Sequence, residues 1–200
     1  FDCRGEIHAE DNVFIDINCV FEGEVHLQQG CHIEPNCILI DVKLGANTRV
    51  KAFSHLQNTQ LDHDASVGPF AYCRAKTHLA ENSKIGCFVE TKNTRIGKMS
   101  KAAHLSYLGD LSIGENVNIG AGVIHCNYNG IKKFQSTIHD GAFIGADSQL
   151  IGPVTIGAKA TVAAGSTICR DAPASQLSIA RSKQVNIKSW KRPQRQTEHN

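Results

Sequence analysis

Aliphatic residues recur at every sixth position along most of this chain. The most regular stretch has them at Ile138, Ile144, Leu150, Ile156, Val162 and Ile168. Four positions after each of the first five stands a small or branched residue: Ala142, Ser148, Val154, Ala160 and Ser166. A helix has a period of 3.6 residues and a simple hairpin sheet a period of two, so neither explains this pattern. A solenoid explains it, because each turn of the chain lays down short strands whose aliphatic side chains point inward.

The same phase extends back to Leu27 in groups of three aliphatic positions, each group spanning 17 or 18 residues. These groups are Leu27, Ile33, Leu39; Leu44, Val50, Leu56; Leu61, Val67, Cys73; Leu79, Ile85, Thr91; Ile96, Ala102, Leu108; and the incomplete Ile113, Ile119. The missing residue of the shorter groups always falls after the third member, which predicts a three-sided coil with one tighter corner. Residues 7–25 follow the pattern less strictly, and we assign them to a first coil. The predicted fold is therefore all-β, a parallel β-helix of hexapeptide repeats.

One interruption breaks the repeat. From Ile113 to Ile138 the chain has 25 residues, about seven or eight more than one coil needs. Extra residues in a solenoid are expelled as a loop, often on the binding face. We predict that residues 125–137, with the sequence HCNYNGIKKFQST, form this loop.

Charge divides the chain into a body and a tail. The 200 residues carry a formal net charge of +2. Residues 171–200 hold six Lys or Arg against Asp171 and Glu198, so we predict a β-helix domain at 1–170 and a basic C-terminal tail at 171–200. The tail has a lone Trp190 and no repeated aromatic residues, so we expect no nucleic-acid binding. No apolar run is long enough to span a bilayer, so we expect no membrane insertion. The only methionine is Met99, which leads us to expect a fragment or a processed product.

The eight cysteines include no CxxC pair. Cys31 and Cys37 stand four positions after Leu27 and Ile33, which is an inward phase of the repeat. We interpret the cysteines as small buried hydrophobic residues in a reducing compartment, with disulfides or zinc as the alternatives. His104 and His125 fall about one coil apart but lack a suitable third histidine, so we predict no metal site.

Several segments resemble a known family: GPFAYCR, GCFVETKNTRIGKMSKAAHLSYLGD, IGENVNIGAGVIHCNYNGIKKF and RPQ. They are similar to the left-handed β-helix acyltransferases, and most closely to the C-terminal acetyltransferase domain of the bacterial bifunctional enzymes of UDP-N-acetylglucosamine synthesis. The resemblance implies transfer of acetyl from acetyl-CoA to the 2-amine of glucosamine-1-phosphate, which yields N-acetylglucosamine-1-phosphate for cell-wall and lipopolysaccharide precursors. It further implies a cytoplasmic homotrimer with active sites between subunits and left-handed coiling, whereas the repeat itself gives no hand. The uridylyltransferase domain of those enzymes has no counterpart in this sequence.

Acetyl transfer to an amine needs a base, because only the neutral amine attacks. His104, in KAAHLSYLGD, stands where the repeat requires no histidine, and taken alone it reads as a surface or scaffold residue. The resemblance implies that His104 is the catalytic base and that Glu90, in FVETK, orients its imidazole and keeps it basic.

A sugar phosphate needs cations. Arg74 follows the inward Cys73 and Lys92 follows the inward Thr91 one coil later, so both can converge on one anion, although any single Lys or Arg is usually a solvated surface charge. The resemblance implies that the sugar phosphate is held by Arg74, Lys92, Tyr107, Asn118 and, from the loop, Lys133. Simple packing for Tyr107 and a corner role for Asn118 remain alternatives.

The resemblance also implies an acetyl-CoA site made by Ala121, Asn127, Tyr128, Ala146, Ala164 and Arg181. The family usually has serine where Ala146 stands, so a backbone contact would persist there but a hydroxyl contact would not. Arg181 suits a CoA phosphate. Residues 127–130, NYNG, read alone as a turn. Two alternatives to this function remain: another hexapeptide acyltransferase with a different phosphorylated acceptor, and a non-catalytic β-solenoid that serves as a binding module.

Overall fold

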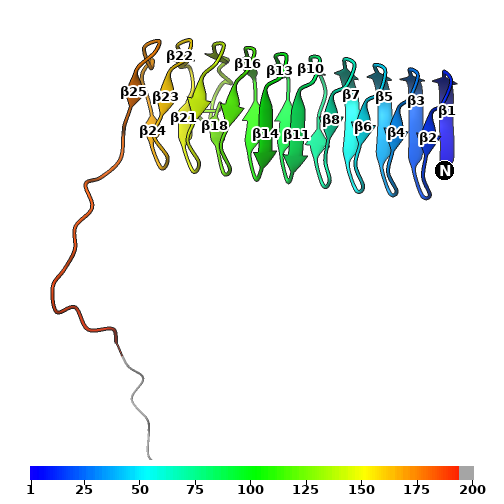
Figure 1. The fold of residues 1–200 in the computed structure, drawn as a ribbon. Coiled ribbons are helices and arrows are strands. Elements are labelled where there is room, and N and C mark those ends of the chain that lie inside the picture. Colours follow the sequence, from blue (N-terminus) through cyan, green and yellow to red (C-terminus); the bar gives the residue numbers. More distant parts are fainter. Residues whose placement is uncertain (194–200) are drawn as a thin grey trace, which may run out of the picture.

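The structure is a computed structural model that describes residues 1–193; residues 194–200, the end of the predicted tail, lie outside the described part. Every regular element in residues 1–193 is a β-strand. The strands stack as a row of coils from β1 (Asp2–Ala9) to β25 (Leu177–Ser178), after which the chain runs away from the stack (Figure 1). The molecule is thus a β-solenoid built on the hexapeptide repeat, as predicted.

Each coil has three sides, which we call the first, second and third faces. All strand pairs within them are parallel. The second face is one ten-stranded sheet: β2 (Phe14–Ile15), β4 (His32–Ile33), β6 (Arg49–Val50), β8 (Ser66–Val67), β11 (Lys84–Cys87), β14 (Lys101–His104), β17 (Asn118–Ile119), β20 (Phe143–Ile144), β23 (Thr161–Val162) and β25.

The first and third faces belong to one larger sheet. Near the N-terminus, β3 (Val20–Leu27), β5 (Ile38–Leu44) and β7 (His55–Leu61) run continuously from the third face to the first. Later strands divide. The first face continues as β10 (Thr77–Leu79), β13 (Arg95–Ile96), β16 (Leu111–Ile113), β19 (Ser136–Ile138) and β22 (Thr155–Ile156). The third face continues as β9 (Tyr72–Cys73), β12 (Glu90–Lys92), β15 (Tyr107–Gly109), β18 (Ile124–Cys126), β21 (Gln149–Ile151) and β24 (Thr167–Ile168).

The corner between the third and first faces is the tight one. A single residue in the left-handed region turns the chain there: Asp41 has φ 51°, Asn58 φ 46° and Asn93 φ 48°. Asn and Asp tolerate this region better than other residues with a side chain. The one-residue deficit read from the sequence is therefore this corner.

The repeat positions form the core. Every predicted inward aliphatic from Leu27 to Ile168 is buried, and so are the small residues Ala142, Ser148, Val154, Ala160 and Ser166. Each fully buried Leu or Ile side chain contributes about 2 kcal/mol of hydrophobic stabilisation. Several inward hydroxyls are bonded to backbone carbonyls, as Ser148 Oγ is to Gly145 O at 2.8 Å.

Cysteines occupy both core and surface. Cys19, Cys31, Cys37 and Cys73 are buried, and all eight thiols are free. Burial raises the pKa of Cys37 and of Cys73 to about 12, which keeps these thiols protonated and unreactive. The buried set fits the predicted role as small hydrophobic residues, whereas Cys3 and Cys169 are exposed.

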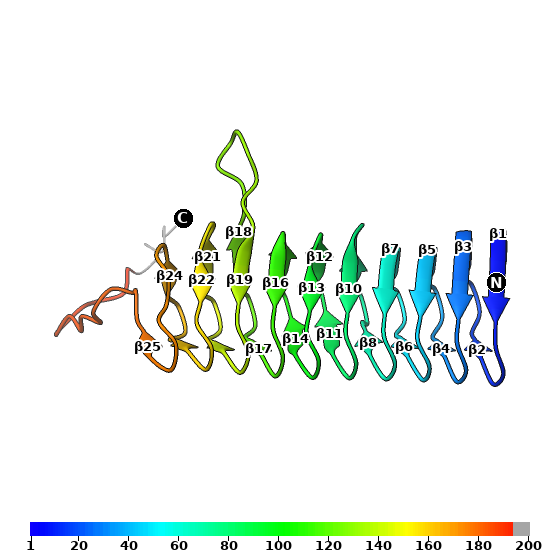
Figure 2. The same ribbon diagram turned by 90° about the horizontal axis from the view of Figure 1, so that it is seen from above.

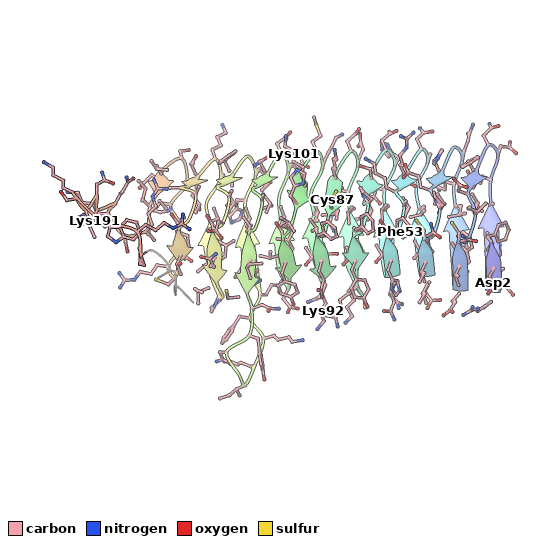
Figure 3. The ribbon with its side chains drawn as sticks, turned by 90° about the horizontal axis from the view of Figure 1, so that it is seen from below. Asp2, Phe53, Cys87, Lys92, Lys101 and Lys191 are labelled. Carbon is pink, nitrogen blue, oxygen red and sulfur yellow. The ribbon has the colours of Figure 1, made fainter. Side chains whose placement is uncertain are left out.

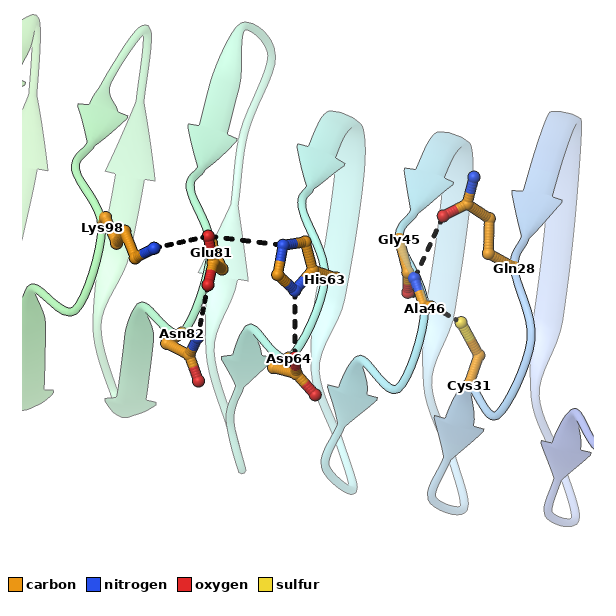
Figure 4. A network of polar contacts seen from close by, with 9 residues as sticks. All are labelled: Gln28, Cys31, Gly45, Ala46, His63, Asp64, Glu81, Asn82 and Lys98. Carbon is orange, nitrogen blue, oxygen red and sulfur yellow. Dashed lines mark hydrogen bonds and ion pairs between the residues drawn. The ribbon is translucent and has the colours of Figure 1, made fainter.

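Polar side chains link neighbouring coils along the outside (Figure 4). Glu81 Oε2 lies 2.8 Å from Lys98 Nζ and 3.3 Å from His63 Nε2, and His63 Nδ1 lies 3.0 Å from Asp64 Oδ2. Each exposed ion pair of this kind adds at most about 1 kcal/mol. These contacts tie coils together and involve none of the predicted site residues.

A loop projects from the stack between β18 and β19 (Figure 2). An antiparallel bridge between Tyr128 and Lys133 closes it into a small hairpin. The projecting part is shorter than the predicted 125–137, because His125 and Cys126 belong to β18 and residues 136–137 belong to β19.

Strand pairing also continues past residue 170. Ala172 is buried and bridges Ile156, and β25 pairs with β23. The following residues up to 193 form no strand, and Val185, Ile187 and Trp190 are exposed. None of the described residues forms a helix that could cross a membrane.

Candidate functional site

Three of the predicted cations converge at one edge of the third face. Lys92 ends β12, which pairs with β9 one coil earlier, and Arg74 directly follows β9. The ammonium of Lys133, from the loop, lies close enough to lower the pKa of Lys92, and the Arg74 charge lowers it further. Figure 3 shows Lys92 pointing outward on the side from which the loop projects. This cluster of like charges, which we call the cation cluster, is suited to a multiply charged anion.

Glu90 belongs to the same edge. Its Oε1 accepts a hydrogen bond from Arg74 Nη1 at 2.9 Å, and this carboxylate raises the pKa of Arg74. The Arg74 guanidinium also lies over the Tyr72 ring, 5.8 Å from its centroid. Within residues 1–193 no hydrogen bond joins Glu90 to His104, so the contact observed for Glu90 is with Arg74. The expected role of Glu90 beside His104 stays a prediction.

Tyr107 lies against this cluster. Glu90 pairs with Tyr107 and Lys92 pairs with Gly109 in the neighbouring strand β15. A Cβ atom at Gly109 would overlap the Tyr107 Oη, so the phenol lies across this glycine. The absence of a side chain at Gly109 therefore brings the Tyr107 hydroxyl toward the edge where Lys92 stands.

The base of the loop rests on a buried carboxylate that the sequence analysis missed. Asp110 is 8% exposed. Its Oδ1 accepts from Asn93 Nδ2 at 2.7 Å and its Oδ2 from Asn127 Nδ2 at 2.6 Å. Asn93, Asp110 and Asn127 follow one another at intervals of 17 residues, so they stack at the tight corner of successive coils. That spacing was visible in the sequence and could have revealed the stack.

His125 fastens the other side of the loop base. Its ring is 1% exposed, and burial lowers its pKa, which keeps it neutral near pH 7. Nδ1 lies 2.5 Å from Gly109 O and Nε2 lies 2.8 Å from Ser136 Oγ. Because a carbonyl can only accept, Nδ1 carries the proton and Nε2 accepts from the Ser136 hydroxyl. Ser136 Oγ in turn accepts from Val154 N at 3.0 Å. His125 is thus a structural residue that joins both ends of the loop to the coil.

A second group of predicted residues lines the corner between the second and third faces. Backbone contacts connect its members coil by coil. Gly122 N donates to His104 O at 3.2 Å, Asp147 N to Ala121 O at 2.7 Å and Gly165 N to Ala146 O at 2.8 Å. Finally, Arg181 Nη1 donates to Ala164 O at 2.7 Å. We call this line, His104–Ala121–Ala146–Ala164–Arg181, the corner row.

His104 begins the corner row. It ends β14, its side chain is exposed, and its ring makes no hydrogen bond with the described part of the chain. Asn118 lies on the same face, because β17 pairs Asn118 with Lys101 of β14. Exposure leaves the imidazole of His104 accessible to a substrate.

The corner row and the cation cluster lie at opposite edges of the third face. Four residues separate His104 from Gly109, the strand partner of Lys92, and Leu105 turns the chain between them with φ 51°. The structure of one chain therefore unites Arg74, Lys92, Tyr107 and Lys133, and separately unites His104, Ala121, Ala146, Ala164 and Arg181. Of the remaining candidates, Glu90 is bonded to Arg74, Asn118 lies on the second face, and Asn127 and Tyr128 belong to the loop.

The loop candidates differ in exposure. Asn127 is buried and its side-chain amide is bonded to Asp110. Tyr128 is 57% exposed, and its hydroxyl donates to Gly130 O at 2.6 Å. Of these two residues, Tyr128 is the one that presents its side chain to solvent.

Known families match the repeat region. Residues 135–170 match the family described as bacterial transferase hexapeptide (six repeats), and residues 110–132 match the hexapeptide repeat of succinyl-transferase. The Bifunctional protein GlmU of Cellvibrio japonicus is 55% identical over 197 residues, which cover 98% of this chain and 44% of that protein. The proteins of the same name from Xylella fastidiosa and Bordetella parapertussis are 52% and 48% identical, over 98% and 96% of this chain. The chain is thus similar, over almost its whole length, to proteins of the name GlmU.

The chain matches the C-terminal part of these proteins and spans less than half of their length. The resemblance noted in the sequence is thereby confirmed. Among solved structures, the Arabidopsis UDP-N-acetylglucosamine acyltransferase has a TM-score of 0.51 at 15% identity, covering 86% of this chain and 68% of that one. The Francisella novicida UDP-N-acetylglucosamine acyltransferase has a TM-score of 0.50, also at 15% identity, over 89% and 65%. At this identity these two structures support the fold alone.

Proposed function

We propose that this chain transfers acetyl from acetyl-CoA to the 2-amine of glucosamine-1-phosphate and so produces N-acetylglucosamine-1-phosphate. The observation that carries the proposal is the convergence of Arg74, Lys92 and Lys133 beside the loop, in a chain that matches the C-terminal part of GlmU over almost its whole length. The product would serve the synthesis of UDP-N-acetylglucosamine, a precursor of cell wall and lipopolysaccharide. Because acetyl-CoA is used there, we place the reaction in the cytoplasm.

In this proposal the cation cluster binds the sugar phosphate. A phosphate monoester carries close to two negative charges near neutral pH, which matches a site built from Lys and Arg. Glu90 fixes the Arg74 guanidinium through the 2.9 Å hydrogen bond, which lowers the entropy that Arg74 loses on binding. The hydroxyl of Tyr107 and the amide of Asn118 supply further hydrogen bonds to the sugar.

The corner row binds acetyl-CoA. Its members stack at successive coils, so an extended pantetheine chain can run along them from Ala121 to Ala164 while Arg181 meets a CoA phosphate. At Ala146 the contact is a backbone one, since alanine has no hydroxyl. In this proposal Tyr128 and Asn127 reach this site from the loop of a neighbouring subunit, because the loop of the same chain stands at the opposite edge of the third face.

His104 then acts as the base. The neutral 2-amine attacks the thioester carbonyl, a C–N bond forms, and His104 takes the proton that the nitrogen loses. The tetrahedral intermediate collapses with cleavage of the C–S bond, and CoA leaves as its thiol after protonation. An imidazole suits this step because it titrates near neutral pH.

The two groups of residues support assembly as a homotrimer. His104 and the cation cluster stand at opposite edges of one face, so a complete site requires the corner row of one subunit to meet the cation cluster of another. The third faces of neighbouring subunits are the surfaces that must approach for this. Left-handed coiling is part of the same proposal.

The direct test is to incubate the chain with acetyl-CoA and glucosamine-1-phosphate and to detect the acetylated sugar by mass spectrometry. Thiol release gives the rate, with a blank of protein alone, because Cys3 and Cys169 are exposed. Glucosamine and glucosamine-6-phosphate serve as matched acceptors. We expect glucosamine-1-phosphate to be strongly preferred. A preference for another phosphorylated acceptor would favour the alternative acyltransferase, and no acetylation of any acceptor by folded protein would favour a non-catalytic binding module.

A further inference from the structure

The first two coils carry the same tripeptide pattern one coil apart, Glu6-Ile7-His8 and Glu24-Val25-His26. β1 and β3 pair in parallel with Glu6 opposite Glu24 and His8 opposite His26. Alternate residues of a strand share a face. Val25 is buried in the core and Ile7 packs against it, so the two glutamates and two histidines point outward together. Four potential metal ligands thus form a rectangle on two adjacent strands.

The ligand atoms are already close together. His26 Nε2 lies 2.7 Å from Glu24 Oε1, and His8 Nε2 lies 3.6 Å from Glu6 Oε2. The rings of His8 and His26 stack with their centroids 4.6 Å apart. One ligand atom from each of His8, Glu24 and His26 lies within 4.8 Å of the other two. Ligand atoms around tetrahedral zinc are about 3.4 Å apart, given metal–ligand distances of about 2.1 Å, so small side-chain rotations close the difference.

We propose that His8, Glu24 and His26 bind a Zn²⁺ ion, with Glu6 or water in the fourth position. Two imidazoles and a carboxylate are a donor set that zinc favours. The strand pairing fixes the Cα positions of all three ligands, so the site needs no rearrangement of the backbone. One neighbour opposes binding: Lys43, on β5, stands opposite His26 and is exposed.

The ion would join the first two strands of the row, β1 and β3. Within the described residues β3 is the partner strand of β1, so the first coil is paired on one side. A metal bound to His8 and to His26 joins these two strands. Because the site lies in the first coils and the proposed acetyl-transfer residues lie from residue 74 onward, zinc should stabilise the fold without changing acetyl transfer (Figure 1).

The test is a calorimetric titration of the chain with Zn²⁺, run with the exposed thiols Cys3 and Cys169 replaced by serine so that they cannot compete. We expect one equivalent to bind. His26→Ala should weaken binding by about 100-fold or more, since even the loss of an outer partner costs 10–100-fold, and Glu24→Gln should weaken it as well. The matched control is His139→Ala, which removes another exposed histidine and should leave binding unchanged. Lys43→Gln should strengthen it.

A second measurement locates the ion. In NMR spectra, Zn²⁺ should shift the ring signals of His8 and His26 and no other histidine, and the melting temperature should rise with Zn²⁺ in the parent protein but not in His26→Ala. Circular dichroism verifies that each variant is folded. Absence of binding by the parent protein, or equal binding by His26→Ala, would overturn the proposal, and so would shifts at other histidines alone.

Discussion

The carboxylate of Asp110 accepts a hydrogen bond of 2.6 Å from the side-chain amide of Asn127, exactly one 17-residue coil further along. This bond joins the corner beside Lys92 to the first residue of the projecting loop. It places Lys133, carried by the same loop, in reach of the other cations. The position of Lys133, a proposed phosphate ligand, thus depends on a buried carboxylate at the base of its loop.

We predict that Asp110→Asn loosens the loop. Asparagine tolerates the left-handed backbone at this corner, where φ is 54°. The substitution therefore removes the charged hydrogen-bond acceptor without straining the backbone. Hydrogen bonds to charged groups contribute about 1.5–3 kcal/mol, and we expect a lower melting temperature and a raised KM for glucosamine-1-phosphate. Asp64→Asn, the same substitution at another left-handed corner with φ 58°, is the control. Unchanged KM in a folded Asp110→Asn protein would show that the bond does not position the loop.

The cation cluster makes a prediction about substrate selectivity. Arg74→Ala, Lys92→Ala and Lys133→Ala should each weaken glucosamine-1-phosphate binding about 10- to 100-fold, because each removes a charge-assisted contact to phosphate. Acetyl-CoA binding should change much less. Lys159→Ala, which removes an exposed lysine elsewhere, is the control. Steady-state KM values and calorimetry compare the loss of affinity for the two substrates. Equal losses for both would contradict the assignment of these residues to the phosphate.

Lys92 should be the most reactive lysine of the chain toward amine-directed reagents. The neighbouring Lys133 is the main cause of its lowered pKa, with Arg74 contributing, while Asp110 acts in the opposite direction. A larger fraction of Lys92 is therefore neutral at mildly alkaline pH than of an ordinary lysine. Lys133→Gln should raise the Lys92 pKa and slow its acetylation by acetic anhydride, which peptide mass spectrometry can quantify.

The lowered pKa of Lys92 also determines how the contribution of this residue to the free energy of unfolding changes with pH. Because the Lys92 pKa is lower in the folded chain, folding disfavours its proton, and this penalty is present at neutral pH. It disappears as the pH rises from the lowered folded pKa to the ordinary value of 10.5. In the acetylation experiment, bound phosphate should raise the pKa of Lys92 and slow the reaction of Lys92 with acetic anhydride. Modification that is equally fast with and without Lys133 would contradict the coupling.

The sequence predicted the core and the corners because both follow from a strict repeat. An inward position such as Leu150 must be apolar in every coil, and the tight corner at Asp41 removes one residue each time. The convergence of Arg74 and Lys92 was predictable for the same reason, since both follow an inward residue one coil apart. Periodicity thus gives the strand, the face and the coil of a residue.

Side-chain partners were harder to predict, because spacing does not say which neighbour a flexible group chooses. Glu90 bonds to Arg74 on its own face, a contact that the spacing did not reveal, and its role beside His104 stays a prediction. The predicted loop, 125–137, is longer than the projecting segment, because His125 and Ser136 are polar and read as loop residues. In the structure both are buried, and they are hydrogen-bonded to each other. Four of the six predicted acetyl-CoA residues, Ala121, Ala146, Ala164 and Arg181, line up at successive coils, whereas Asn127 and Tyr128 belong to the loop.

The last prediction concerns His104. Its side chain is exposed and makes no hydrogen bond with residues 1–193, so nothing in the fold requires an imidazole there. If His104 takes the amine proton, His104→Ala should lower kcat by roughly 10²–10⁴-fold, the usual contribution of a positioned base. The melting temperature and the mass in solution should stay as in the parent protein, and His139→Ala, another exposed histidine, should keep full activity. The rate of the parent protein should fall toward acid pH in the range where imidazoles titrate, and this limb should vanish in His104→Ala. A folded His104→Ala protein with near-full turnover would make His104 a scaffold residue and leave water as the base.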